Sequence, residues 1–580
     1  MAAFPDTQPV REDTVVLTAT GKSQHHRHMR WSSLVILSAL STGCFSPEVD
    51  TDLEASGTDS SSGGTDATSP TGGQTDGETD PTMGPSESTD SSNPTMGMET
   101  ESDTMDTTGV PGDDPPVIEA FEANGSATPA DVTQSSQIHL SATVTDDNGV
   151  SSVAFYDGDT LLGTVTEEPF EFDVLVTSVE SGSHAFSAVA TDTVEQETTS
   201  DEIPLNVSIV GGDVIDTNEG LFEGISSFGI FGGIAQVSEN RLVVVGVNAM
   251  TEIEAPISSI VTLDENLSQI NDTTFPINYP ATPRRFEDGV ALLPGTLVQE
   301  VTTTKNGLVA TTAMRYEMFD VNLGAIVPAG ALQFPGGNSS AGPCVVESVG
   351  NGFALATSPT ALTGFEYDLD IELWENDFPV GPSESAAIRA SASLPDGSVV
   401  VSFDTSDGCL GSATDTCLRR INSDGTTAWT LPTQFAPDRG ALVSDDAGGV
   451  FYANRVDDGL LVAHLDSNGE ELDSAVLTFP NPVTTLAPQV SRDLRGGVVV
   501  GLATGQQQND GSIVGEVGTV MRLDPELAEI WRVNGFAVGS RPVASVVSAE
   551  GSVYILGIEA TDTPTIFGAV GDVWAARANL

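Results

Sequence analysis

Basic residues are scarce in this sequence. Its 580 residues include 20 lysines and arginines against 84 aspartates and glutamates, which gives a formal net charge of −64 at pH 7. No lysine or arginine occurs between Arg30 and Arg241. Nucleic acids and anionic surfaces are recognised through clustered lysine and arginine side chains, so this charge excludes DNA and RNA as partners.

Residue types that commonly bind metals or act as catalytic groups are also few. The sequence has four cysteines and six histidines, and none of them are spaced like a zinc ligand set. It has no serine-nucleophile elbow, metalloprotease helix or phosphate-binding loop. Paired carboxylates stay open as an acid–base device, because 84 acidic residues produce every spacing. We therefore assign no catalytic, cofactor-binding or metal-ligating residue from the sequence.

Glycine, proline and short apolar runs are plentiful. There are 59 glycines and 33 prolines, and 39% of the residues are hydrophobic. This composition favours strands and turns over long helices, so we expect an all-β protein. A chain of this length is expected to form two to four domains.

The first apolar stretch, residues 31–40, is shorter than the roughly 20 residues that a permanent membrane helix needs. Basic residues precede it, and Ser41-Thr42-Gly43-Cys44 follows it, which is the layout of an export signal. This ending resembles the lipobox of bacterial lipoproteins. The resemblance implies cleavage before Cys44, diacylation of its thiol and anchoring of the mature chain to a lipid bilayer.

Residues 29–43 are therefore expected to be a lipoprotein signal peptide. Ser41 stands where the lipobox usually has leucine, with Leu40 one place further out, so a plain secretory signal is the alternative. Residues 1–28 contain acidic residues and a histidine cluster that are foreign to the start of a signal. That segment is either an over-called start, with Met29 as the initiator, or an extended n-region.

Residues 44–115 consist mainly of serine, threonine, aspartate, glycine and proline, and contain no basic residue. Such a segment buries too little apolar surface to offset its conformational entropy, so we expect a disordered acidic tether. A flexible coil of this length spans on the order of 45 Å, which lifts the following domains away from a membrane.

Residues 116–209 alternate between apolar and polar, as at Ile138, Leu140, Ala142 and Val144. Turn signals separate six or seven such runs, which predicts a β-sandwich. The order Asp146-Asp-Asn-Gly-Val150, Val153-Ala-Phe-Tyr-Asp-Gly158 and Gly182-Ser-His-Ala-Phe-Ser-Ala-Val-Ala-Thr-Asp192 is similar to bacterial Ig-like domains of cell-surface proteins. The resemblance implies spacing or adhesion.

Asp146, Asp147 and His184 are the residues of this module to be considered as metal ligands. Asp146 and Asp147 are candidate calcium ligands through their carboxylate oxygens, and capping of the turn is the competing role. His184 is expected to lie in a strand at the sheet edge, without a metal partner. We leave calcium unassigned and predict no other cofactor.

Residues 210–580 repeat two markers seven times, with a spacing of about 50 residues. The first marker is an apolar residue followed by Asp or Asn at a strand end, and the second is a Gly or Arg before an apolar run. The first marker occurs at Leu263-Asp264, Phe319-Asp320, Tyr367-Asp368, Ile421-Asn422, Leu465-Asp466, Leu523-Asp524 and Ala578-Asn579. Gly307, Gly352, Gly397, Gly449, Gly497 and Gly551 begin the second, and Arg241 takes this place in the first repeat.

A unit of this length with four short strands is the size of a propeller blade, so we expect a seven-bladed β-propeller. The seventh unit lacks an outer strand, and Asp213-Val-Ile-Asp216 or the segment just after it is expected to supply one. An open β-solenoid is the alternative. The unit around Trp429 resembles quinoprotein-type propeller repeats, with Trp374 and Trp531 similarly placed, and this likeness implies fold but no dehydrogenase activity.

Cys409 and Cys417 lie in one loop, and their spacing predicts a local disulfide in an exported protein. Cys344 is then expected to be a buried thiol. His464 immediately precedes a strand-end marker, so strand packing is the expected role and catalysis the alternative.

These features favour a lipid-anchored protein of the bacterial envelope, at the outer membrane or cell surface. An Ig-like spacer would present the propeller for non-catalytic binding or adhesion to a protein or glycan. Arg284-Arg285 and Arg419-Arg420 are the expected basic groups of an exposed binding face. The alternatives are a hydrolase, lyase or oxidoreductase that uses the propeller funnel, and a structural envelope component without a specific ligand.

Overall fold

The computed structural model describes the chain from residue 114 onward, with short gaps. The residues outside the description are 1–113, 220, 222–230, 249–256, 276–283, 288–289, 305–306, 321–324, 328–330, 335–345, 350–351, 359–360, 367–371, 379–387, 406–408, 412–415, 434–439, 446, 457–458, 485–487, 508–512, 539 and 566–567. Predictions for the signal, Cys44, the tether and Cys344 therefore lie outside the described residues.

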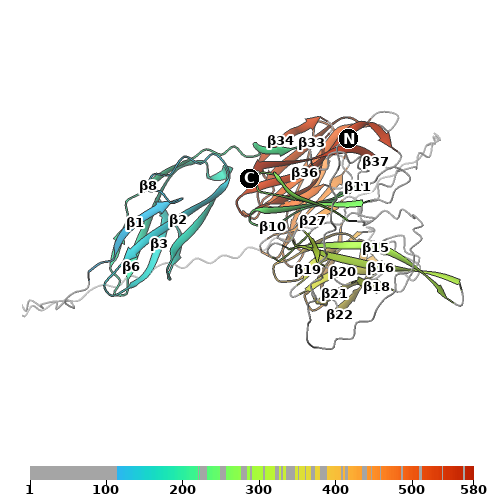
Figure 1. Cartoon of the computed structure of the whole chain (residues 1–580), viewed down its shortest axis with the longest axis horizontal. Coiled ribbons are helices and arrows are strands. Elements are labelled where there is room, and N and C mark those ends of the chain that lie inside the picture. The colour runs from blue at the N-terminus through green and yellow to red at the C-terminus, as the bar shows by residue number, and fades with distance from the viewer. Residues whose placement is uncertain are drawn as a thin grey trace, which may run out of the picture. The chain divides into compact units, whose positions relative to one another are not determined.

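The described chain is all-β, as expected (Figure 1). Its helices are the single 3-10 turns η1 (Ser178–Glu180) and η2 (Cys409–Gly411). Within the described residues, neither helix has the length and hydropathy to cross a bilayer.

The first module consists of two antiparallel sheets that enclose one apolar core. One sheet has the order β1-β2-β5 and the other β4-β3-β6-β7, with β8 also paired to β6. The strands are β1 (Val117–Ala123), β2 (Ser136–Thr145), β3 (Val150–Asp157), β4 (Thr160–Val165), β5 (Phe170–Val176), β6 (Gly182–Asp192), β7 (Glu197–Thr199) and β8 (Ile203–Val207).

The alternation predicted for β2 is confirmed. Ile138, Leu140, Ala142 and Val144 are all buried in the core cluster between the two sheets. Successive side chains of a strand point to opposite faces, so the intervening polar residues lie on the other face. The turn before β3 places Gly149 at φ 103°, a conformation that favours glycine.

Residues 214–580 form seven further antiparallel sheets, called repeat sheets one to seven. Sheet one has β10 (Phe231–Ser238), β11 (Arg241–Asn248), β12 (Ile257–Leu263) and β13 (Gln269–Phe275). Sheet two has β14 (Arg284–Glu287), β15 (Val290–Thr304), β16 (Gly307–Asp320), β17 (Ala325–Val327) and β18 (Ala331–Phe334). Sheet three has β19 (Val346–Val349), β20 (Gly352–Ser358), β21 (Ala361–Glu366) and β22 (Glu372–Asp377).

The last four sheets repeat the same order. Sheet four has β23 (Ile388–Ser393), β24 (Val399–Asp404), β25 (Thr416–Ile421) and β26 (Thr427–Thr433). Sheet five has β27 (Gly440–Ser444), β28 (Val450–Val456), β29 (Gly459–Leu465) and β30 (Glu471–Leu477). Sheet six has β31 (Gln489–Arg492), β32 (Val498–Gln507), β33 (Ile513–Leu523) and β34 (Glu529–Val538). Sheet seven has β35 (Ser540–Val547), β36 (Ser552–Thr565), β37 (Gly568–Asn579) and β9 (Val214–Asn218).

The second strands of sheets four and six are buried on both faces. Residues 399–401 of β24 and 498–500 of β32 are completely inaccessible. Their apolar runs have no polar alternation because sheets four and six each pack against a neighbour on either side. Apolar clusters join sheet three to four, four to five, five to six, six to seven, and seven to one.

The fourth strand of sheet seven comes from the start of the repeat region. β9 pairs antiparallel with β37, with Val214 opposite Ala578 and Asp216 opposite Arg577. This confirms that the segment at 213–216, extended to Asn218, supplies the missing outer strand.

The second marker is misplaced in sheet two. In the other six sheets the second marker begins the second strand or lies within two residues before it, but Gly307 begins the third strand, β16. β15 and β16 form a long hairpin of 15 and 14 residues. The apolar run that begins the true second strand, Val290–Leu293, therefore lies earlier than the spacing of the other units predicts.

Candidate functional site

The aspartate of the first marker caps a turn in sheets one, five and six. In sheet five, Oδ1 of Asp466 accepts the backbone N–H groups of Asn468 and Glu470, both at 2.8 Å. Asp264 and Asp524 cap the corresponding turns of sheets one and six in the same way. These hydrogen bonds hold the pKa of the Asp466 carboxyl below its ordinary value, although burial acts in the opposite direction. Asp264, Asp466 and Asp524 are therefore occupied by their turns.

These turns all lie at one end of the sheets, here called the turn end. In an antiparallel meander, the connections between first and second strands and between third and fourth strands lie at the same end. The connection between second and third strands lies at the opposite end, called the loop end.

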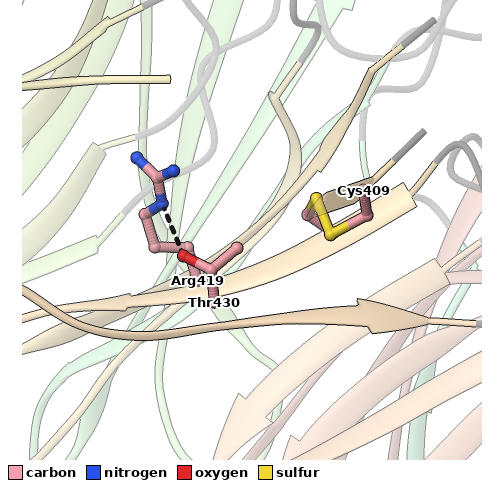
Figure 2. The surroundings of a disulfide bond; sticks show 4 residues. Cys409, Arg419 and Thr430 are labelled. Atoms are coloured by element: carbon pink, nitrogen blue, oxygen red, sulfur yellow. Dashed lines mark hydrogen bonds between the residues drawn. A yellow bond between two sulfur atoms is a disulfide. The ribbon is translucent and has the colours of Figure 1, made fainter. Parts of the chain in front are cut away.

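A disulfide lies at the loop end of sheet four. Cys409 in η2 is bonded to Cys417 in β25, with 5.4 Å between the two Cα atoms (Figure 2). Both cysteines are buried. Leu410, between them, has φ 53° and is 67% exposed. The disulfide thus fixes an apolar side chain in solvent, at a backbone conformation that is unfavourable for leucine.

Arg419 does not belong to an exposed binding face, contrary to the prediction. It is 6% exposed, and its guanidinium lies 5.2 Å from the ring centroids of both Phe378 and Phe403. Its Nε donates to Thr430 Oγ1 at 3.1 Å, as Figure 2 shows, and its Nη1 donates to Asn376 Oδ1 at 2.9 Å. Burial lowers the pKa of Arg419. The aromatic rings and amide compensate for lost hydration, so the side chain is structural.

Arg420 is also buried, on the other face of β25. Its Nη2 pairs with Asp396 Oδ2 at 2.5 Å, and its Nη1 donates to the backbone oxygens of Gly448 at 3.1 Å and Ser467 at 2.5 Å. Adjacent strand residues point to opposite faces, and β25 is covered on both, so neither arginine reaches solvent. Arg284 and Arg285 are in β14, and their side chains lie outside the described residues.

His464 has the packing role expected for it. It is 7% exposed in β29 and stacks on Phe451 with a centroid distance of 4.0 Å. Nε2 lies 2.8 Å from Asp445 Oδ2, and Nδ1 lies 3.1 Å from the carbonyl oxygen of Pro525. Both ring nitrogens are therefore engaged within the protein.

His184 is not at a sheet edge. Its strand, β6, has β3 on one side and β8 on the other. Nδ1 lies 2.6 Å from Asp157 Oδ2 and Nε2 lies 2.7 Å from the carbonyl oxygen of Glu180. Burial alone would lower the pKa of His184, but these hydrogen bonds outweigh it and raise the pKa. Both partners are acceptors, so the protonated ring, which donates from both nitrogens, satisfies them best.

The Asp146-Asp147 pair lies in a tight turn. Oδ1 of Asp146 accepts the N–H of Asn148 at 2.9 Å, which is the capping role. Among the described residues there is no group of three or more His, Cys, Asp or Glu side chains arranged to hold a metal ion.

One set of residues was missed in the sequence. The residue just before the marker in sheets four to seven is basic or histidine, and it binds the first hairpin of its own sheet. These residues are Arg420, His464, Arg522 and Arg577. Three of them also reach the following sheet: Arg420 at Ser467, His464 at Pro525, and Arg577 at Asn266. The sequence pattern that could have identified them is a basic residue or histidine directly before the first marker.

A family model described as a bacterial Ig domain matches residues 125–188. This match agrees with the sandwich of β1–β8 and suggests an extracellular or surface protein. The chain has no significant match among curated proteins.

Several solved structures are similar to parts of the chain. The fibronectin(III)-like modules of Clostridium thermocellum CbhA are 25% identical, with 16% of this chain and 98% of that chain covered and a TM-score of 0.15. The computationally designed Ika8 protein is 12% identical, with 64% and 100% covered and a TM-score of 0.35. A europium-containing methanol dehydrogenase is 10% identical, with 57% and 77% covered and a TM-score of 0.32. These scores are too low to support an argument about function.

Proposed function

We propose that the seven repeat sheets are the blades of one β-propeller. The first strands of six neighbouring pairs of sheets contact each other: β10 with β14, β19 with β23, β23 with β27, β27 with β31, β31 with β35, and β35 with β10. Sheets seven and one share an apolar cluster that includes Leu242, Val244, Leu556 and Val573. A circular order of blades with an outer strand from the other end of the repeats accounts for both contacts.

We further propose that the protein is a lipid-anchored surface protein that binds a protein or glycan of another surface through the loop end. The export signal and tether supply the anchor in this hypothesis, and the Ig-like module supplies the spacer. The observation that carries it is the Cys409–Cys417 disulfide, which fits an oxidising compartment and holds Leu410 exposed at 67%. Preordering a loop lowers the entropy cost of binding.

The anchor is tested by the intact mass of the membrane-extracted protein and by protease treatment of whole cells. A chain cleaved before Cys44 that carries acyl groups, and is removed from intact cells by protease, is expected. Replacement Cys44→Ala should release the protein into the medium. An unacylated wild-type protein in the medium would contradict the anchor.

The binding role is tested with a glycan array and with envelope fractions as probes. Binding that is lost in Leu410→Asp and kept in Leu472→Asp, at a site 59% exposed on β30, would support the loop end. Equal binding by both variants would contradict it. Turnover of an arrayed glycan would instead favour the competing hypothesis of a surface hydrolase or lyase.

A further inference from the structure

The third and fourth strands of a repeat sheet are joined by a five-residue turn. In sheet four, the N–H of Asn422 donates to Thr426 O at 2.8 Å and the N–H of Gly425 donates to Asn422 O at 2.9 Å. Sheet five has the same two bonds between Asp466 and Glu470 and between Gly469 and Asp466. The glycine has φ 81° in both turns.

Sheet seven builds the same turn from two separate segments. Its third strand, β37, is far from its fourth, β9, in sequence. The N–H of Asn579 nevertheless donates to Asp213 O at 3.0 Å, and the N–H of Gly212 donates to Asn579 O at 2.9 Å. Gly212 has φ 77°. Residues 579–580 and 211–213, here called the split turn, therefore reproduce the bonds of the continuous turns.

In the continuous turns, the residue after the marker accepts an indole N–H from the preceding sheet. Nε1 of Trp374 donates to Ser423 O at 2.9 Å, and Nε1 of Trp429 donates to Ser467 O at 3.0 Å. The corresponding tryptophan of sheet six is Trp531, whose buried Nε1 has no hydrogen-bond partner within the described residues.

The carbonyl oxygen that would correspond to the acceptor of Trp531 is bound instead by the Ig-like module. Leu580 O, at the position of Ser423 and Ser467, accepts the N–H of Ser178 at 3.1 Å and the hydroxyl of Ser178 at 2.8 Å. The N–H of Ser135 donates to Asn579 Oδ1 at 2.9 Å. Both acceptors lie in the 579–580 segment of the split turn, so the module binds the split turn where its two segments lack a covalent connection.

Charged contacts surround the same place. Arg495, in the first hairpin of sheet six, pairs with Glu180 Oε1 at 2.8 Å and donates to Leu175 O at 2.7 Å. The completely buried Arg522 donates to Thr177 Oγ1 at 3.4 Å, instead of reaching a turn of the next sheet as Arg420 does.

We infer that the Ig-like module is a clamp that holds the split turn closed and so keeps β9 paired with β37. The module thereby stabilises the pairing that joins the two ends of the repeat region, in addition to the spacer role proposed above. Since residues 208–213 lead directly from β8 to β9, tension on the N-terminal side reaches the module before it reaches β9. Without the clamp, such tension would peel β9 from the edge of sheet seven, one hydrogen bond at a time.

The test compares glycine variants of the full chain by hydrogen exchange. A Cβ at Gly211 would overlap Trp531 and lie 2.8 Å from Ser178 Oγ, whereas a Cβ at Gly182, in the Ig-like module, meets no atom within 4 Å. Gly211→Ala is expected to raise the exchange rates of the β9 and β37 amides at least tenfold while β1–β8 stay protected. Gly182→Ala should leave them unchanged.

A second pair of variants avoids any folding defect of Gly211→Ala. Arg495→Ala removes the ion pair to the module, and Arg532→Ala removes an ion pair of similar length, to Glu529, within β34. Faster exchange of β9 in Arg495→Ala alone supports the clamp. Equal exchange in both variants, or protection of β9 that is unaffected by Gly211→Ala, would overturn it. These outcomes do not depend on lipidation or on a ligand, so the proposed function and the clamp fail separately.

Discussion

The buried pair Arg522–Asp493 allows the cost of an unpaired charge to be measured cleanly. Arg522 Nε donates to Asp493 Oδ2 at 2.7 Å and Nη2 donates to Oδ1 at 3.2 Å, and both side chains are at most 1% exposed. Asp493→Asn keeps the shape and the Oδ1 acceptor that caps the N–H of Arg495. The change removes the countercharge of Arg522 and replaces the Oδ2 acceptor of its Nε by an amide donor, so the guanidinium is left buried without an anion, and we expect a loss of about 3–5 kcal/mol in stability.

The assay is chemical denaturation of the mature chain followed by tryptophan fluorescence, with the denaturant dependence compared between variants. Glu529→Gln is the matched control, because its partner Arg532 is at the surface and such a pair contributes less than about 1 kcal/mol. Adding Arg522→Met to Asp493→Asn should recover most of the loss, since no charge then remains buried. An equal shift of the denaturant midpoint in Asp493→Asn and Glu529→Gln would refute the expected cost of the buried charge.

Three further predictions concern stability. Replacing Cys409 and Cys417 together by serine should cost about 2–3 kcal/mol on the chain-entropy model, measured by denaturation with and without reductant; no loss would contradict a closed loop. The raised pKa of His184 stabilises the fold below about pH 6.5, an effect lost as pH rises through the folded-state pKa, so His184→Gln should destabilise more at about pH 5 than at pH 8. Burial raises the pKa of Tyr554 to about 12, so its contribution is lost as pH rises from 10 through 12, and Tyr554→Phe should resist alkaline unfolding.

Much of the fold was predictable because its elements are local. The alternation in β2 follows from a sheet with one buried face, and the apolar run in β24 follows from a sheet buried on both. The strand-end aspartates were found because a turn cap needs a short acceptor side chain at a fixed position. The place of Gly307 in its sheet was not predictable, because the spacing of the markers does not reveal that a whole second strand, β15, precedes it.

The roles of Arg419 and Arg420 were not predictable from their own segment. Two adjacent arginines suggest a solvent-exposed basic patch, since charged side chains are seldom buried unless paired. The groups that compensate for their burial come from other strands and other sheets, as Phe378 does for Arg419 and Ser467 does for Arg420. No sequence window contains both partners. The same holds for the split turn, whose two halves meet only when sheet seven is complete.

The location of these basic groups changes what the net charge implies for a ligand. Arg419, Arg420 and Arg522 are each less than 9% exposed, so their guanidinium groups are withdrawn from the surface. The solvent-exposed surface is therefore poorer in positive charge than the already acidic composition indicates. An acidic surface repels anionic ligands and attracts cations over a Debye length. Under the binding function proposed above, a partner of the loop end should thus be neutral or basic, and the association rate of a basic partner should fall with added salt.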